Sequence, residues 1–162
     1  MKIAVYPGSF DPVTKGHLNI IKRAAAIFDK VYVCVMVNST KQPMFTREER
    51  VELIKKSCHD LANVEVETYG GLLVEYAEQV GACAIVKGLR AVSDFDWEFQ
   101  MALANKKIKP EIETLFLASS EKHTYLSSTV VKELGKYGAE LDDFVPPEII
   151  EDVKKKFESG GV

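Results

Sequence analysis

Residues 3–21, IAVYPGSFDPVTKGHLNII in one-letter code, carry the signals for a strand, a turn and a helix in immediate succession. The run Ile3-Ala4-Val5 is short and apolar, as strands are, and Leu18 and Ile21 have the spacing of one helix face. Between them lie two glycines, two prolines and His17. A glycine-bearing turn into a helix presents unpaired backbone N–H groups and the positive end of the helix dipole, which favour a phosphate. We therefore predict a strand–turn–helix unit with an anion site at its turn.

The rest of the chain repeats this alternation of strand and helix. Short apolar runs typical of strands occupy residues 2–6, 31–37, 83–87 and 113–118, and residues 64–68 alternate as an edge strand does. Pro146 and Pro147 open a last helix of about residues 146–158, followed by a frayed tail. The pattern predicts the α/β class, with one domain over residues 1–162: a doubly wound, Rossmann-like sheet of five mainly parallel strands with helices on both faces.

Composition excludes several classes of protein. A chain of 162 residues fits one domain, and a net charge of -3 with interspersed signs gives no broad basic face for a polymeric nucleic acid. Three cysteines without metal-ligand spacing are typical of reduced thiols in a cytoplasm. No apolar run approaches the ~18 residues of a membrane span, and no signal peptide is recognisable. We expect a cytoplasmic protein that binds neither nucleic acid nor membrane.

Polar and charged residues follow four of the five predicted strands. Residues 8–17 follow the first strand, 38–41 the second, 87–90 the fourth and 119–129 the fifth. Ligands of such sheets bind beyond the carboxyl ends of the strands, so these four segments should converge on one edge. The spacings of dinucleotide folds and of Walker loops are absent, which disfavours nicotinamide and P-loop chemistry.

Taken one by one, the candidate residues have ordinary structural interpretations. A lone His17 is more often a solvated first-turn residue, and Ser9 a local turn cap. Lys87 is more informative, because a charge that ends an apolar strand should emerge at the ligand edge. Ser127-Ser128-Thr129 predicts a helix cap that is compatible with a phosphate site. Arg47-Glu48-Glu49-Arg50 is typical of a solvated helix face.

Four motifs in order resemble one enzyme family. Residues 8–17 are similar to the first signature of nucleotidyltransferases with the H-x-G-H-type motif, and Thr14 stands in place of its first histidine. Together with residues 41–46 (KQPMFT), 86–96 (VKGLRAVSDFD) and 125–133 (YLSSTVVKE), they resemble bacterial phosphopantetheine adenylyltransferases over essentially the whole chain. That family joins 4′-phosphopantetheine to the AMP part of ATP, releasing pyrophosphate and forming dephospho-coenzyme A. The resemblance implies this reaction, Mg²⁺ brought with ATP, and a homohexamer.

The resemblance also assigns roles to individual residues. It implies that His17 stabilises the transition state, with Lys41 and Arg90 as further catalytic residues. It places 4′-phosphopantetheine at Ser9, Lys41, Leu73 and Lys87. It places ATP at Ser9, Phe10, His17, Gly88, Leu89, Arg90, Glu98, His123, Thr124, Tyr125, Leu126, Ser127, Ser128 and Thr129. Family members commonly carry threonine at the position of Ser9 and often arginine at that of Lys87, so this chain keeps the hydroxyl and the charge but loses the bidentate guanidinium.

The expected chemistry needs no general base. The second pKa of a phosphate monoester is about 6, so near neutral pH the acceptor is largely a dianion able to attack the α-phosphorus directly. Catalysis would then consist of positioning and charge stabilisation around an in-line transition state, without a covalent intermediate. Two alternatives stay open. One is another acceptor, such as nicotinate mononucleotide or a phosphoalcohol in cytidylyl transfer, and the other is a non-catalytic nucleotide-binding or flavodoxin-like module.

Overall fold

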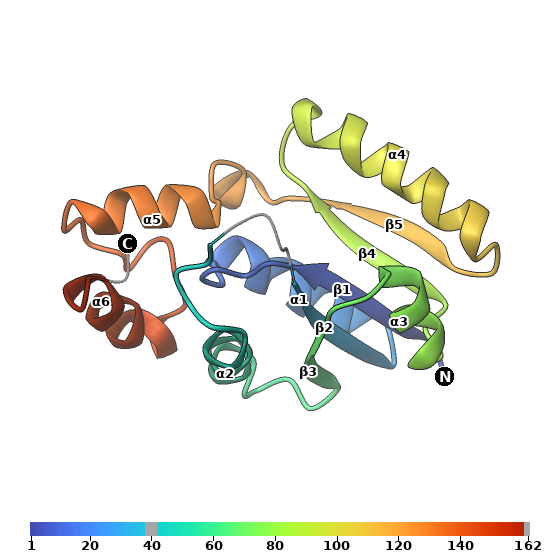
Figure 1. The fold of residues 1–162 in the computed structure, drawn as a ribbon, viewed down its shortest axis with the longest axis horizontal. Coiled ribbons are helices and arrows are strands. Elements are labelled where there is room, and N and C mark those ends of the chain that lie inside the picture. Colours follow the sequence, from blue (N-terminus) through green and yellow to red (C-terminus); the bar gives the residue numbers. More distant parts are fainter. Residues whose placement is uncertain (38–41, 161–162) are drawn as a thin grey trace.

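The computed structural model describes residues 1–37 and 42–160, except for the side chains of residues 92 and 93. Within them, five strands form one parallel sheet in the order β3-β2-β1-β4-β5 (Figure 1). The strands are β1 (Ile3–Gly8), β2 (Lys30–Met36), β3 (Val64–Tyr69), β4 (Ala84–Leu89) and β5 (Glu113–Ala118). The order is that of a doubly wound α/β sheet, as predicted, and β3 is indeed an edge strand. From β1 the chain builds the sheet outward through β2 to β3, and it then returns to the other side of β1 to add β4 and β5. The switch point therefore lies between β1 and β4, and ligands bind at such points.

Helices lie in the four connections between consecutive strands and also follow β5. They are α1 (Lys15–Ile27), α2 (Arg47–Ser57), α3 (Leu73–Gln79), α4 (Val92–Ile108), η1 (Glu121–His123), α5 (Ser128–Lys136), η2 (Pro147–Ile149) and α6 (Ile150–Glu158), where η marks a 3₁₀ helix. The predicted last helix therefore begins as a 3₁₀ turn after Pro146 and continues as α6. Figure 1 shows α2, α5 and α6 gathered at the end of the molecule away from the N-terminus. No helix in the described part of the chain is both long and apolar enough to cross a bilayer.

The sheet has an apolar core on each face. Ala4 and Tyr6 of β1 belong to the larger core, which also contains buried residues of α1, α2, α5 and α6. Ile3 and Val5 belong to the smaller core, which contains buried residues of α3. Successive side chains of a strand point to opposite faces, so both faces of a central strand must be apolar. This explains why residues 31–37, which include most of β2, form an apolar run without alternation.

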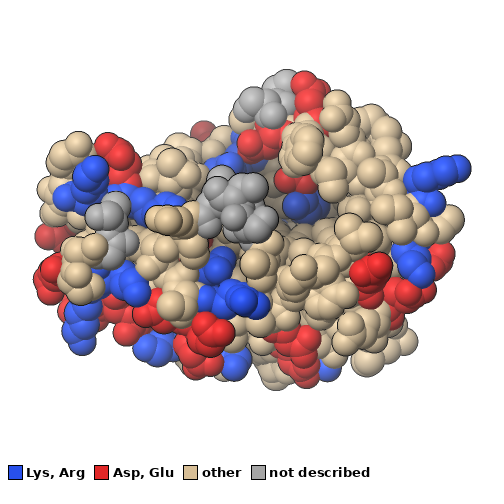
Figure 2. Space-filling view, in the orientation of Figure 1, with Lys and Arg blue, Asp and Glu red and all other residues tan. Residues whose placement is uncertain are grey.

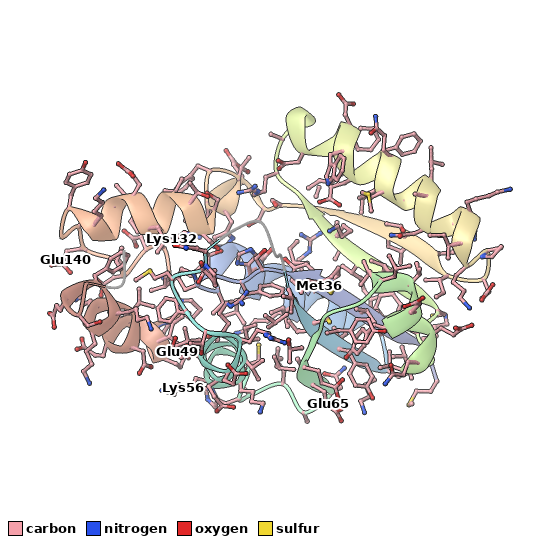
Figure 3. The ribbon with its side chains drawn as sticks, in the orientation of Figure 1. Met36, Glu49, Lys56, Glu65, Lys132 and Glu140 are labelled. Carbon is pink, nitrogen blue, oxygen red and sulfur yellow. The ribbon has the colours of Figure 1, made fainter. Side chains whose placement is uncertain are left out.

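A capping box fixes the start of α2, and its glutamate also joins α2 to α6. The Thr46 hydroxyl oxygen accepts a hydrogen bond from the Glu49 N–H (3.2 Å), and the Glu49 carboxylate accepts one from the Thr46 N–H (2.7 Å). The same carboxylate accepts two bonds of 2.9 Å from Lys156 of α6. Figure 3 shows Glu49 on the side of α2 that faces α6. These contacts, with that of Lys156 the strongest, hold the pKa of Glu49 below its usual range, so the pairing persists at neutral pH.

The three cysteines are free thiols. Cys34 and Cys58 are buried, and burial raises the pKa of each thiol to about 12. Such thiols stay protonated and unreactive near neutral pH and serve as small apolar side chains.

Candidate active site

A cleft of about 890 Å³ opens at the carboxyl ends of the strands. Its described lining comes from β1, the turn after it and α1, from Val37, Gln42 and Pro43, from β4, from the segment after β5 with the start of α5, and from α2 and α4. Figure 2 shows a hollow beside the grey residues, with charged side chains of both signs inside it. The predicted convergence of the segments after β1, β4 and β5 is confirmed. Residues 38–41, the predicted contribution of the second strand, lie outside the described residues.

Most of the predicted site residues line this cleft. They are Ser9, Phe10, His17, Lys87, Gly88, Arg90, Glu98, His123, Leu126, Ser127, Ser128 and Thr129. Leu73, Leu89, Thr124 and Tyr125 are not among the lining residues that the structure describes, and Lys41 lies outside the described residues. Leu73 packs against the smaller core, and the Tyr125 ring packs edge-on against Phe144. The binding roles of all these residues stay predictions.

His17, the third residue of α1, is held by the N-cap residue Thr14. The Thr14 N–H donates to Nδ1 of His17 (3.0 Å), and the His17 N–H donates to the Thr14 hydroxyl oxygen (3.3 Å). A backbone N–H can only donate, so Nδ1 presents its lone pair and the proton of the neutral ring resides on Nε2. His17 lines the cleft. The ring therefore offers Nε2–H, without a positive charge, as its donor to a ligand.

Burial sets the charge of this ring, and a neighbouring aromatic side chain packs against it. Burial, with a smaller contribution from the positive charge of Arg90, lowers the pKa of His17 to about 4. The Phe10 ring packs edge-on against the imidazole, with centroids 5.0 Å apart. Phe10 is 1% exposed and has a φ of 49°, a left-handed conformation that is strained for a residue with a Cβ. The turn thus holds Phe10, which packs against His17, in a strained backbone conformation.

We expect the burial of a neutral His17 to make the protein less stable as the pH falls from 6.5 to 4. The unfolded chain binds a proton near pH 6.5, but the folded His17 binds one only near pH 4, so protons favour the unfolded chain in this window. Urea unfolding at pH 7 and pH 5 should show a larger loss for the parent protein than for His17→Asn, which cannot titrate. Equal losses of stability in the two proteins, or an Nδ1–H signal from His17 in ¹⁵N NMR, would contradict a neutral, buried imidazole with its proton on Nε2.

The start of α5 forms another wall of the cleft. Ser127 is the N-cap of α5, and its hydroxyl oxygen accepts a hydrogen bond from the Val130 N–H (3.1 Å). The Ser128 hydroxyl donates to the Pro12 carbonyl (2.8 Å) and so joins α5 to the first turn. Arg90 Nη1 donates to the Leu126 carbonyl (2.8 Å), which places a positive charge beside the same helix start. Backbone N–H groups, the helix dipole and a guanidinium thus meet where a phosphate would be stabilised.

In the segment of residues 127–129, we expect one residue to cap α5 and another to bind the ligand. Ser127→Ala should lower the free energy of unfolding by ~0.5–2 kcal/mol, because it removes the cap of α5. Thr129→Ala should leave that free energy nearly unchanged and weaken ATP binding, since Thr129 lines the cleft. Urea unfolding and calorimetric titration with ATP measure the two effects. Equal stability losses with unchanged ATP binding would assign the whole segment to capping.

Lys87 lies within β4, which extends two residues beyond the predicted end of this strand. Its ammonium pairs with the carboxylate of Glu98 on α4, with Nζ 3.0 Å from Oε2, and the side chains are only 24% and 23% exposed. The next residue, Gly88, permits the close packing of β4 and α1, because a Cβ there would lie 3.0 Å from Cγ1 of Ile20. Lys87 therefore emerges at the ligand edge, as predicted, but carries a partner that the sequence did not indicate.

Two buried charges that frame the cleft were not recognised in the sequence, and Asp11 is the first. Its carboxylate is 5% exposed and accepts hydrogen bonds from the N–H groups of Met44 (2.9 Å) and Phe45 (2.8 Å). Lys132 of α5, labelled in Figure 3, lies 3.2 Å from the same carboxylate. Asp11 thus joins the first turn to the segment before α2 and to α5. A carboxylate inside a glycine- and proline-rich turn was the available signal.

The second is Arg50 of α2, which donates to the Ser9 carbonyl (2.8 Å) and to the Thr46 carbonyl (3.3 Å). Its side chain is 5% exposed and lines the cleft. The prediction of a solvated helix face was therefore wrong at Arg50, although Arg47 and Glu48 are exposed. Arg50 shares the inward face of α2 with the buried Leu53 and Ile54, and this i, i+3, i+4 spacing could have identified it.

Comparison with known proteins identifies the class of protein to which this chain belongs. A family model described as cytidylyltransferase-like matches residues 5–134. The fold is similar to that of a bifunctional NMN adenylyltransferase/ADP ribose pyrophosphatase from Francisella tularensis, with a TM-score of 0.73 and 18% identity, over 99% of this chain and 51% of the other. Fold and family model together define a nucleotidyltransferase.

Relatives narrow the class to one family. The phosphopantetheine adenylyltransferase of Caldanaerobacter subterraneus subsp. tengcongensis is 55% identical over 97% of this chain and 98% of the relative. The one from Desulforudis audaxviator is 53% identical over 97% of this chain and 96% of the relative. The chain belongs to the phosphopantetheine adenylyltransferase family.

Proposed function

We propose that this protein transfers the adenylyl group of ATP to 4′-phosphopantetheine, giving dephospho-coenzyme A and pyrophosphate in coenzyme A biosynthesis. The observation that carries the proposal is the convergence of His17, Lys87, Arg90 and the start of α5 on one cleft, in a chain of this family. We place the reaction in the cytoplasm, where ATP is available and the thiols of this chain persist in reduced form.

The two substrates are assigned to different walls of the cleft. Arg90 and the start of α5 bind the β- and γ-phosphates of ATP, and His17 lies between this wall and the acceptor. Ser9, Lys41 and Lys87 hold the phosphate of 4′-phosphopantetheine. In support, the lining side chains of Ser9, His17, Lys87 and Arg90 all supply hydrogen-bond donors, which suits two phosphorylated ligands.

The reaction is a direct displacement at the α-phosphorus. An oxygen of the acceptor phosphate forms a bond to the α-phosphorus, while the bond to the bridging oxygen breaks and pyrophosphate leaves with the electron pair. The acceptor is already a dianion near neutral pH, so no side chain needs to remove a proton. Nε2–H of His17 donates to the α-phosphate oxygens, on which negative charge accumulates in the transition state.

Magnesium is assigned to the ATP phosphates and water as a co-substrate. Among the described residues no group of three or more His, Cys, Asp or Glu is placed to hold a metal ion, and the cleft carboxylates Asp11 and Glu98 are paired with lysines. Bound with ATP, Mg²⁺ neutralises charge on the triphosphate. Activity should be lost in EDTA and restored by excess Mg²⁺.

A pyrophosphate-release assay tests the reaction. Release is expected with ATP and 4′-phosphopantetheine and not with pantetheine, which lacks the attacking phosphate. Nicotinate mononucleotide as acceptor and CTP as donor test the other transfers in the same assay. Release with one of these but not with 4′-phosphopantetheine would assign a different reaction, and ATP binding without release from any pair would leave a nucleotide-binding module.

The proposed homohexamer is supported by an apolar surface on α4 and β5. The exposed apolar residues of these elements are Phe95, Trp97, Phe99, Met101, Leu103, Ile108 and Leu115, with exposures of 39–64%. So many apolar side chains on neighbouring elements are typical of a surface that binds another protein. Light scattering should give a mass about six times the 18.1 kDa of the chain. The charged variant Trp97→Glu should lower that mass.

A further inference from the structure

The ion pair between Lys87 and Glu98 sets a negative charge beside the lysine assigned to the acceptor phosphate. The pair joins β4 to α4 inside the cleft, with 3.0 Å between Nζ and Oε2. Its side chains are about half as exposed as those of the surface pair Lys22–Asp60, at 48% and 52%. Solvent and salt screen a partly buried pair less, so its charges act more strongly on a ligand that enters the cleft.

The charge of Glu98 opposes the binding of any anion at Lys87. An incoming anion gains the attraction of the ammonium and meets the repulsion of the carboxylate, so it binds more weakly than it would at an unpaired lysine. A phosphate dianion doubles both the attraction and the repulsion, but its several acceptor oxygens also meet an ammonium that has three N–H donors. It can therefore take over donors of Lys87 while the carboxylate keeps one.

A lysine needs this partner more than an arginine would. Its ammonium lies at the end of a flexible four-carbon stem and has no planar fork to fix its direction. Immobilising such a side chain costs conformational entropy. In this structure Glu98 orients the Lys87 ammonium before a ligand arrives.

We propose that Glu98 is a positioning residue that acts through Lys87: it holds the ammonium in place and lowers the affinity of the acceptor subsite for phosphate anions. This inference rests on the proposed function and changes the role of Glu98, for which family likeness implied contact with ATP. This orientation has a cost, because the carboxylate weakens binding of the acceptor phosphate.

The test is Glu98→Gln, which keeps the shape and a hydrogen-bond acceptor for Lys87 but removes the charge. We expect KM for 4′-phosphopantetheine to fall roughly three- to tenfold, with KM for ATP within twofold of the parent value. Inorganic phosphate and chloride should become stronger competitive inhibitors, with the larger gain for phosphate, because the carboxylate repels its dianion more than a monoanion. The matched control is Glu113→Gln, which removes the same charge from the pair with Lys106 of α4, outside the lining of the cleft.

A double-mutant cycle decides whether the effect passes through Lys87. In a Lys87→Met background, Glu98→Gln should no longer change KM for the acceptor. An unchanged or raised KM for the acceptor, a larger change in KM for ATP, or an effect that persists in this background would overturn the proposal. Calorimetric titration with inorganic phosphate alone needs no turnover, so failure of the proposed reaction would leave this comparison intact. Tighter phosphate binding by Glu98→Gln than by the parent protein is the expected result there, and equal binding would again overturn the proposal.

Discussion

His17→Ala should lower kcat by roughly 10²–10³-fold and leave KM for ATP and for 4′-phosphopantetheine nearly unchanged. The Thr14 N–H holds Nδ1, so Nε2–H is aimed at the ligand before it binds. The imidazole is neutral because burial lowers its pKa to about 4, so it adds little to the ground-state attraction of the triphosphate. Its hydrogen bond strengthens as charge accumulates on the α-phosphate oxygens, and the loss therefore falls on kcat.

Steady-state kinetics on folded variants measure this effect. His17→Asn keeps a donor on a shorter side chain and should recover part of the loss. His59→Ala is the matched control, because His59 lies just after α2, is exposed, and has its ring Nδ1 3.0 Å from the Lys56 carbonyl oxygen. A kcat of His17→Ala within a few-fold of the parent value would remove His17 from the mechanism. A large rise in KM for ATP would make it a ground-state binding residue.

Asp11→Ala should lower the free energy of unfolding by about 3–5 kcal/mol. The buried carboxylate accepts hydrogen bonds from the Met44 and Phe45 N–H groups and pairs with Lys132. Alanine would leave the N–H groups of two buried residues and a partly buried ammonium without this acceptor. Buried donors without partners are expensive because they have given up water on folding.

Urea unfolding checks this value, with Asp60→Ala as its control. Asp60 pairs with Lys22 on the surface at 3.6 Å, with side chains that are 52% and 48% exposed. Removing such a pair should cost no more than about 1 kcal/mol. Similar losses in the two variants would mean that Asp11 does not stabilise the junction of the first turn, residues 44–45 and α5. Asp11→Asn should fall between them, since an amide oxygen still accepts but its NH₂ group faces donors.

Sequence periodicity predicted the sheet because the apolar residues that mark a buried strand follow one another along the chain. The unbroken apolar run of residues 31–37 indicates two covered faces wherever it occurs, and a lysine at the end of the apolar fourth strand has to emerge at an edge. Contacts between distant segments leave no such mark. Arg50 donates to a carbonyl 41 positions away in sequence, a partner that the residue spacing within its own helix does not indicate.

Much of the cleft lining was predictable from the sequence, whereas the pairings between its side chains were not. The motifs brought His17, Lys87, Arg90 and Ser127 to one place, as the structure confirms. Thr14 stood out only as a departure from a histidine, whereas its N–H sets the tautomer of His17. Such roles depend on backbone geometry that residue identity alone does not encode.

The strand order has a consequence for protein synthesis. β1 is made first but occupies the middle of the sheet, between β2 and β4. As the chain leaves the ribosome, β1 can pair with β2 early, while its other edge waits for residues 84–89. The cleft needs still later residues, because Ser128 and Lys132 bind the first turn from α5. A nascent chain therefore cannot form the complete cleft until most of its length has emerged, and until then the unpaired edge of β1 is open to pairing with other strands.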